Sequence, residues 1–492
     1  MKIARLSFIV CAIGCNGAPL IVAGPDQPQP ISPIVCPELD DCISLYVADN
    51  GDDQNQGTRQ SPLKTLDRAV AVASMSISGG VAQRRYVRVS NARPVAMQSA
   101  TLAAGISIYG GYDADWTVNP QRQTDVIVHG RGLVFDSGTL GNELRDLTLV
   151  GDTDTDTLVE ARGNATLTHV ALAWNMRANH PFVSRGGDVS MTDTFVTGAG
   201  VAVDIQGGNL TFDSGGVDAM SPTMGGVVIG LRYEGQAGQH FILRNAKVLA
   251  TDGSDIAGLD LGGQAEVEIE RNTIDVQGSV DSIATGIRGS AAHENVVGNL
   301  FQIRGAVTTI GHSVGASGQA LVNNIFALSN VTAVPTTAPI GILLVAPGQI
   351  DLVNNTVTMR NGGVAVDGDG RVRLYNNLLI TTDGVALHLT PALGASSFQL
   401  FNNALTTSQC AFRVGADCVS DIDSCAFTGC KHASATLVGD CQASVDLHLP
   451  SSSLCKGAGT DPKAVVPRTI LDCDGQARPL GAWDIGADEI PD

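Results

Sequence analysis

The sequence is poor in aromatic and charged residues, which make up 4% and 16% of its 492 residues. A helical protein of this size would be expected to rely on Glu, Lys and Leu at helical spacing. This chain is instead rich in Val, Thr, Asn and Ala, and it has 57 glycines. That composition favours short strands and turns. Hydrophobic residues make up 43% of the chain, which is enough for a sizeable core.

The sequence also lacks a cluster of basic residues, and its net charge is −19. Nucleic-acid binding needs Lys and Arg patches that neutralise phosphates, so we expect no nucleic-acid partner. The negative charge also argues against electrostatic docking on anionic membranes, and its simplest meaning is solubility. After the N-terminal region, no segment reaches 18 uninterrupted apolar residues, so no transmembrane helix is predicted.

The N-terminus has the features of an export signal. Lys2 and Arg5 precede an apolar run at residues 6–13 that is too short to span a bilayer. The run ends at Ala12-Ile13-Gly14-Cys15, which resembles a bacterial lipobox and implies that Cys15 is lipidated. We therefore predict a signal at 1–24, a Pro-rich linker at 25–43 and an outer-membrane or cell-surface lipoprotein. Cleavage near Ala23 is the alternative, and it would give a secreted protein without an anchor.

Cysteines cluster outside the middle of the chain. Clusters of this kind in exported proteins usually form disulfides. The late group contains no C-x-x-C pair, which argues against a zinc site. The sequence does not give the connectivity, and the late group has an odd number of thiols. The disulfide candidates are Cys36, Cys42, Cys410, Cys418, Cys425, Cys430, Cys441, Cys455 and Cys473.

A short pattern recurs along most of the chain, as in "LVNNTVTM" at 352–359: two apolar residues five positions apart flank a polar centre. Eleven copies occur between residues 144 and 405, at an average spacing of about 26, and repetition at this period indicates a solenoid. One copy, Leu210 to Gly215, is degenerate. The other pairs are Leu144/Leu149, Leu167/Leu172, Met191/Val196, Leu243/Val248, Ile269/Ile274, Val296/Phe301, Leu321/Phe326, Leu352/Val357, Leu374/Leu379 and Leu400/Leu405.

An offset of five places two side chains on opposite faces of a flat strand, so both can point inward only if the chain bends between them. Asn and Gly enter the left-handed conformation at low cost, which suits them to the bend. Stacked copies would let the amides hydrogen-bond from coil to coil. We therefore predict an all-β, single-stranded right-handed parallel β-helix over 44–405. The predicted structural ladder consists of Asn245, Asn323, Asn354, Asn376 and Asn402.

Two other architectures fit less well. Leucine-rich repeats share the period, but their L-x-x-L-x-L core is absent. Separate β-sandwich domains would show turn signals without a fixed asparagine register.

The sequence resembles the β-helix proteins of the pectate-lyase-like superfamily, in their exported bacterial surface form. The resemblance rests on "LYVADNGDDQNQGTRQSPLKTLDRAVAVA" (45–73), "ISIYGGYDADW" (106–116) and "DCDGQARPLGAWDIGADEI" (472–490). In the first stretch, Gly51, Asp53, Gly57, Thr58, Pro62 and Thr65 match that family's N-terminal module. The resemblance to this family implies an N-terminal cap at 44–75 and a closing strand near the C-terminus. The cap helix is expected from Ser61 to Ser74, and 406–492 is expected to be a Cys-rich C-terminal cap.

No catalytic site is recognisable in the sequence. The superfamily includes lyases and glycoside hydrolases, but the G-H-G and R-I-K signatures of its polygalacturonases are absent. The best acidic set is "GDTDTDT", where Asp152, Asp154 and Asp156 alternate and could hold a calcium ion. A solvated turn is the simpler interpretation of this segment, and no other cofactor is expected.

We therefore predict an exported, lipid-anchored β-helix protein that acts as a binding or structural module. Its expected partner is a surface glycan or another surface protein, and it would contact the membrane only through its anchor. The alternative is a polysaccharide lyase or glycoside hydrolase acting on a polyuronate. Three or more acidic residues on one outer face, beside a Lys or Arg, would favour the enzyme.

Overall fold

The computed structural model describes residues 42–419 with short gaps, and parts of 430–487. The gaps before 419 are 79–80, 120, 139, 174–179, 222–224, 290, 316–317, 331–338, 346–347, 369–370, 391–396 and 408. The later described residues are 430–432, 437–438, 449–462, 472, 476, 478 and 483–487. The predicted signal at 1–24, with Cys15, and the linker up to residue 41, with Cys36, lie outside these residues. No helix within them is both long and apolar enough to cross a membrane.

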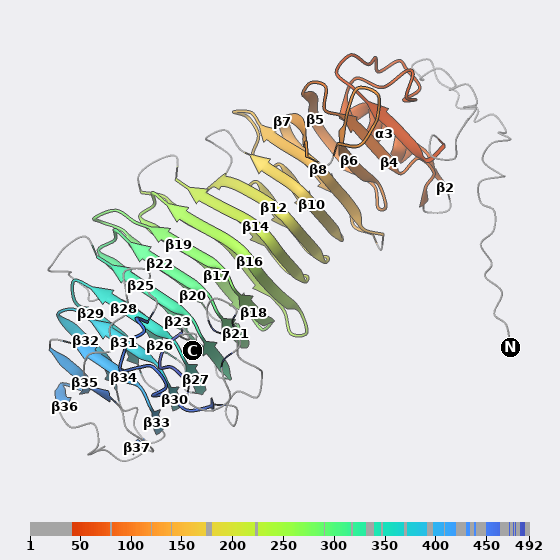
Figure 1. The fold of residues 1–492 in the computed structure, drawn as a ribbon. Coiled ribbons are helices and arrows are strands. Elements are labelled where there is room, and N and C mark those ends of the chain that lie inside the picture. Colours follow the sequence, from red (N-terminus) through yellow and green to blue (C-terminus); the bar gives the residue numbers. More distant parts are fainter. Residues whose placement is uncertain are drawn as a thin grey trace, which may run out of the picture.

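The chain forms a parallel β-helix whose coils stack along one axis (Figure 1). Strands of successive coils pair in parallel, forming three stacks of strands that enclose the core. The first stack contains β1 (Ser44–Val47), β4 (Tyr86–Ser90), β6 (Ser107–Tyr112), β8 (Asn142–Gly151), β10 (Ala165–Ala173), β12 (Val189–Ala199), β14 (Leu210–Met220), β16 (His240–Thr251), β18 (Glu266–Glu270), β21 (His293–Val297), β24 (Gln319–Val322), β27 (Gln349–Val353), β30 (Arg371–Tyr375), β33 (Ser397–Phe401) and β37 (Cys430–His432).

The other two stacks follow the first along each coil. The second contains β5 (Val95–Leu102), β7 (Thr124–Phe135), the later halves of β8, β10, β12, β14 and β16, and then β19 (Thr273–Gln277), β22 (Leu300–Arg304), β25 (Ile325–Ser329), β28 (Thr356–Arg360), β31 (Leu378–Thr381), β34 (Ala404–Thr407) and β38 (Leu437–Val438). The third continues from the ends of β5 and β7 through β9 (Val159–Ala161), β11 (Phe182–Ser184), β13 (Val201–Ile205), β15 (Val227–Gly235), β17 (Asp255–Gly263), β20 (Ile283–Gly289), β23 (Thr308–Val314), β26 (Ile340–Leu344), β29 (Gly363–Gly368), β32 (Gly384–Leu389) and β35 (Cys410–Val414). Pairing of β33 with β37 and of β34 with β38 carries the β-helix beyond the predicted boundary at 405.

The bend between the first and second stacks lies where the repeat predicts it. Eleven centres have a left-handed backbone with φ between 48° and 64°, namely Asp146, His169, Asp193, Ser214, Asn245, Arg271, Gly298, Asn323, Asn354, Asn376 and Asn402. The predicted apolar pairs on either side are buried in one continuous core. The degenerate copy is displaced by two residues, because Phe212 and Val217, rather than Leu210 and Gly215, align with the other pairs.

The continuous amide ladder lies one residue after the predicted one. At the second position of the bend, each Asn Nδ2 donates to Oδ1 of the next coil's Asn over 2.9–3.0 Å. The members are Asn272, Asn299, Asn324, Asn355, Asn377 and Asn403. The predicted residues make the bend itself, and within this row Asn376 Nδ2 donates to Asn354 Oδ1 over 2.9 Å. The second position points into the bend, where a buried amide needs partners from both neighbouring coils.

The N-terminal end is covered by α3 (Leu66–Met75), which starts later than the predicted helix. Thr65, rather than Ser61, is its N-cap, and the Thr65 hydroxyl accepts a hydrogen bond from Arg68 N. Asp53 holds this start in place by accepting from the backbone amides of Lys64 and Thr65 at 3.0 and 2.9 Å. The short strands β2 (Ile77–Ser78) and β3 (Val81–Ala82) follow as an antiparallel pair.

The described part of 449–487, which we call the C-terminal segment, lies against the outside of the last coils. Trp483 packs on Val322 and Val353, and Asn376 exchanges hydrogen bonds with Thr460 at 2.7 and 3.0 Å. Most of the predicted closing strand at 472–490 lies outside the described residues, and in its described part Trp483 makes an isolated antiparallel bridge to Gly459. This arrangement stabilises the side of the β-helix rather than extending its sheet.

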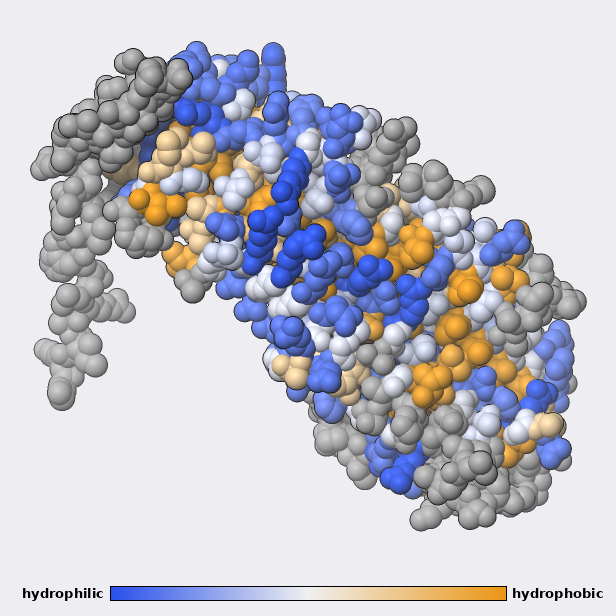
Figure 2. Space-filling view, turned by 180° about the vertical axis from the view of Figure 1, so that it is seen from behind, coloured by the Kyte–Doolittle hydropathy of each residue, from blue (hydrophilic) through white to orange (hydrophobic). Residues whose placement is uncertain are grey.

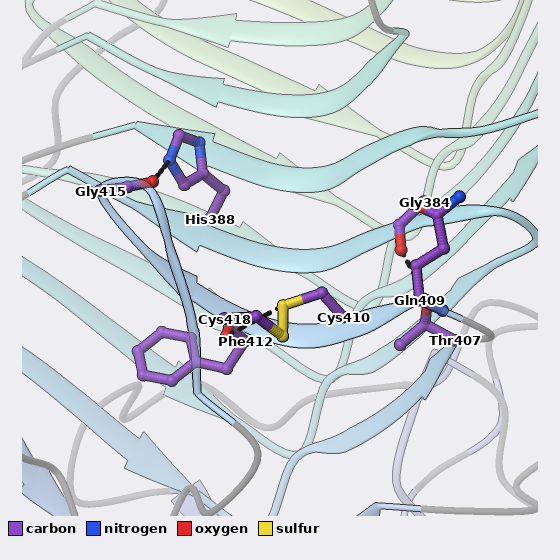
Figure 3. Close-up of a disulfide and its surroundings, with 8 residues drawn as sticks. All are labelled: Gly384, His388, Thr407, Gln409, Cys410, Phe412, Gly415 and Cys418. Atoms are coloured by element: carbon purple, nitrogen blue, oxygen red, sulfur yellow. Dashed lines mark hydrogen bonds between the residues drawn. A yellow bond between two sulfur atoms is a disulfide. The ribbon is translucent and has the colours of Figure 1, made fainter.

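One disulfide lies fully within the described residues. Cys410 and Cys418 join β35 to the antiparallel strand β36 (Asp417–Val419), with a Cα–Cα distance of 5.9 Å (Figure 3). The same hairpin is tied to the preceding coil by a 3.0 Å hydrogen bond from His388 to Gly415 O. Cys42 and Cys455 are also disulfide-bonded. Cys430 lies in β37, and Cys425, Cys441 and Cys473 lie outside the described residues.

Candidate functional site

The outer face of the third stack carries networks of ion pairs. Glu160 lies 2.7 and 2.8 Å from Arg131 and Arg162, while Arg288 contacts Asp255 and Asp260 at 2.7 and 3.3 Å. Three of these four pairs connect neighbouring coils, and the fourth, Glu160 with Arg162, lies within one coil, so we interpret the networks as structural. Figure 2 shows a face with a strongly hydrophilic band in the middle of the molecule and more hydrophobic surface toward the C-terminal half.

A chemically richer surface surrounds the bend in the coils of β12, β14, β16 and β18. We call it the corner surface and define it by Asp213, Arg244, Glu268 and Glu270 on the first stack and Phe195, Asp218 and Lys247 on the second. Strand pairing places Asp213 beside Arg244 and Arg244 beside Glu270. Three carboxyl groups and an arginine therefore share one outer face.

Arg244 is the centre of the first-stack side. Its Nη2 lies 2.9 Å from Oε1 of Glu268, and its Nε lies 3.2 Å from Oε2 of Glu270. On the other side of Arg244, Asn245 at the bend donates a hydrogen bond of 2.9 Å to Asp213. All three ion-pairing side chains are partly exposed, so their attraction contributes little to stability and leaves them accessible to a ligand.

The surroundings of Glu270 raise its proton affinity. Burial raises the pKa of Glu270, and the hydrogen bond and charge of Glu268 raise it further, while Arg244 and Arg271 oppose the shift. Burial lowers the pKa of Arg244, but the hydrogen bond and charge of Glu268, with Glu270 and Asp213, raise it overall. Glu270 therefore retains its proton more readily than an unperturbed glutamate, although the guanidinium of Arg244 lies beside it.

Phe195 dominates the second-stack side. Its side chain is 52% exposed although it lies in the middle of a strand. The adjacent residue in the next coil is Gly216, and a Cβ there would lie 3.3 Å from the phenylalanine ring. The missing side chain leaves room for the ring beside Gly216, where it forms an exposed apolar platform.

Two charged residues lie beside this platform. Lys247 follows Gly216 in the same row across the strands, and Asp218 lies two residues along β14. Burial raises the pKa of Asp218, and the charge of Lys247 partly offsets this shift. An aromatic ring with neighbouring donors and acceptors can bind a ligand that has both apolar and hydroxyl groups.

The residues predicted for calcium lie elsewhere, in the turn after β8. Asp152 Oδ2 is 2.6 Å from His129 Nδ1, and the hydrogen bond from His129 holds the pKa of this aspartate below its usual value. Oδ1 of Asp152 accepts from Asp154 N at 3.0 Å, while Asp156 is exposed at the end of the same turn. In the part of the chain that the structure describes, no three His, Cys, Asp or Glu residues are grouped to hold a metal ion.

The members of the corner surface were not predicted from the sequence, although it contains two signals for them. The alternation in Glu266-Val267-Glu268-Ile269-Glu270 places three glutamates on one face of a strand. Arg244 and Glu270 also occupy the same position in successive repeats, immediately before the bend. Aligning the repeats by their outward residues would have brought these two side chains together.

The strand pairing defines the chain as a parallel β-helix, the architecture of the pectate-lyase-like proteins that it resembles. No protein-family model and no curated protein matches the chain. Among solved structures, a rhamnogalacturonan lyase aligns with 86% of this chain and 97% of its own, at 12% identity and a TM-score of 0.31. This distant likeness assigns no activity.

Proposed function

We propose that this protein is an exported, lipid-anchored β-helix module that binds a glycan at the cell surface through the corner surface. The observation that carries the proposal is the exposed ring of Phe195 over Gly216, between charged groups on both sides of the bend. Pyranose rings have apolar faces edged with hydroxyl groups, so they match an aromatic platform beside carboxylates and amines. The anchor at Cys15 and the export signal rest on the N-terminal sequence.

The enzymatic alternative, a lyase or hydrolase for polyuronates, is favoured by three carboxyl groups beside an arginine on one face. Its geometry is less suitable. Glycoside hydrolases hold their two carboxyl groups about 5 Å or more apart, whereas Glu268 and Glu270 are hydrogen-bonded to each other. A net charge of −19 would also repel a polyanionic substrate. A neutral or amine-bearing glycan is the better partner for the corner surface.

A glycan array with the full mature protein tests this proposal. We expect Phe195→Ala to weaken binding to the recognised glycan about tenfold or more, as for an aromatic residue central to an interface. Met75→Ala removes an apolar side chain at the end of α3 that is somewhat more exposed than Phe195, and it should leave binding unchanged. Equal binding by the two variants would contradict the proposal.

Two further measurements test the lipid anchor at Cys15 and the alternative function as a lyase or hydrolase. The mass of the mature N-terminal peptide should show a diacylglyceryl group on Cys15, whereas a start near Gly24 would rule the anchor out. Release of reducing ends or unsaturated products from the bound glycan, abolished in Glu270→Gln, would establish the enzyme instead.

A further inference from the structure

The interior of the β-helix contains a polar group that the proposed function does not use. Glu294 in β21 and His312 in β23 point inward from two sides of the same coil, and both side chains are fully buried. Gln319 in β24 is 1% exposed and lies one coil further on. The register places Gln319 beside Glu294, because their neighbours Asn295 and Ala320 are paired. Unlike the buried asparagines of the ladder, which are hydrogen-bonded from coil to coil, these three side chains lie outside the bend.

These side chains have few partners for such a buried place. Oε1 of Glu294 accepts a hydrogen bond of 2.7 Å from Ala291 N. Oε2 of Glu294, both ring nitrogens of His312 and both amide atoms of Gln319 have no hydrogen-bond partner. A buried unpaired polar group costs about 1–3 kcal/mol, and a buried charge costs more. Five such atoms on three neighbouring side chains are more than an apolar interior would tolerate without a ligand.

The distance between the two ionisable groups identifies the kind of ligand. Oε2 of Glu294 and Nε2 of His312 lie 3.2 Å apart, yet neither has a hydrogen-bond partner, so the oxygen does not lie along an N–H direction. Two ligands of a tetrahedral zinc ion, bound at about 2.0–2.1 Å, are about 3.3–3.4 Å apart. Two atoms bridged by one water molecule, at about 2.8 Å each, would lie about 4.6 Å apart. The observed separation fits the ion.

We propose that Glu294, His312 and Gln319 form an internal site for one divalent transition-metal ion of the zinc class. The carboxylate supplies the negative charge, the imidazole supplies a nitrogen ligand, and Oε1 of the amide supplies the third ligand, which leaves one position for a solvent molecule. A mixed nitrogen and oxygen set of this size favours zinc over calcium or magnesium, which prefer six or more oxygen ligands. The site lies between two coils, so the bound ion links them.

Because the site is closed, the ion has to enter while the chain folds. The test therefore compares the full chain, with its disulfides intact, refolded from guanidinium chloride with zinc or with EDTA and then freed of unbound metal. We expect one zinc per chain by elemental analysis after refolding with zinc. The melting temperature should rise by about 5 °C or more, because an ion that binds only the folded state stabilises it.

Variants distinguish this site from surface binding. Glu294→Gln keeps the shape but removes the charge, and Gln319→Leu replaces an unpaired amide with a side chain suited to the core. Both should lose the bound zinc and the rise in melting temperature, while His388→Ala, a partly exposed histidine paired with Asp367, should keep them. The proposal is overturned if the wild-type protein refolds equally well without bound metal, or if zinc remains in both variants.

Discussion

The two halves of the β-helix make the same bend in different ways. From Asp146 to Asn245 the bend lies inside single long strands, and its centres are Asp, His, Asp, Ser and Asn. From Arg271 onward the strands are short, and Asn at the second position forms a continuous buried ladder. The described part of the C-terminal segment covers the bend in this later half. The backbone thus needs a left-handed residue in every coil, whereas the amide ladder is needed only where strand pairing is shorter.

The largest expected effect comes from breaking the ladder with Asn355→Leu. Asn355 donates to Leu321 O and Asn377 Oδ1, and its own Oδ1 accepts from Asn324. Removing it leaves several buried groups unpaired, so we expect a loss of about 3–5 kcal/mol, measured by chemical denaturation. Asn245→Gly in the early half keeps the left-handed bend and should cost less than about 0.5 kcal/mol. Similar losses in both variants would remove the distinction between the halves.

The next largest loss of stability should come from weakening the contact between the C-terminal segment and the later coils of the β-helix. Trp483→Ala removes packing on Val322 and Val353 and the contact with Arg478, whose guanidinium lies 5.4 Å from the ring centre. We expect a local loss of about 3 kcal/mol. Hydrogen exchange and limited proteolysis should show earlier opening of 449–487, with little change in β8 to β16. Phe195→Ala is the control, because its ring is exposed. Uniform destabilisation of all coils would contradict a local role for the segment.

A substitution at the N-terminal cap helix should destabilise the protein less than the two changes above. Thr65→Ala removes the N-cap of α3 and one partner of Asp53, which should lower the free energy of unfolding by about 1–2 kcal/mol. Thr65→Ser keeps the hydroxyl and should restore most of the loss. The helical signal in circular dichroism can be followed during denaturation. It reports on α3, because the other elements named in the described chain are strands. Equal effects of Ala and Ser would rule out capping as the cause.

The smallest effect should come from Glu270→Gln on the corner surface. The pKa of Glu270 is raised in the folded protein, so at pH values between its unfolded and folded pKa the folded state binds more of this proton than the unfolded state does. Stability is then greatest below the unfolded pKa of Glu270 and falls as the pH rises through its folded pKa. Gln removes this loss, so we expect a gain of a few tenths of a kcal/mol at neutral pH. Glu266→Gln, an exposed neighbour, should show no such gain.

The sequence predicted the fold well because the repeat is a local property. The five-residue spacing, as in Leu352 and Val357, requires a bend, and the residues at its centre are those that tolerate a left-handed backbone. The degenerate copy at Ser214 was displaced because Phe212 and Leu210 are equally apolar. The helix α3 was placed too early because Pro62 was interpreted as a helix start, although Leu63 instead pairs with Val47.

The candidate site was less predictable, because it depends on which residues of different coils become neighbours. Successive ladder asparagines are 22 residues apart in one coil and 31 in another, so loops of unequal length hide the register. Arg244 and Glu270 are 26 residues apart in sequence and adjacent on the surface. Gly216 under the Phe195 ring gives no signal in a chain with 57 glycines.

The sequence by itself determined that this chain forms a β-helix, because each repeat contains an inward-facing apolar pair and a central residue that adopts a left-handed backbone. Only the tertiary structure decided which amides bond between coils, which coils the C-terminal segment covers, and where carboxyl groups meet an exposed ring. The reason is that a bend needs only its own residues. A contact between coils needs the register of two segments, and variable loops set that register.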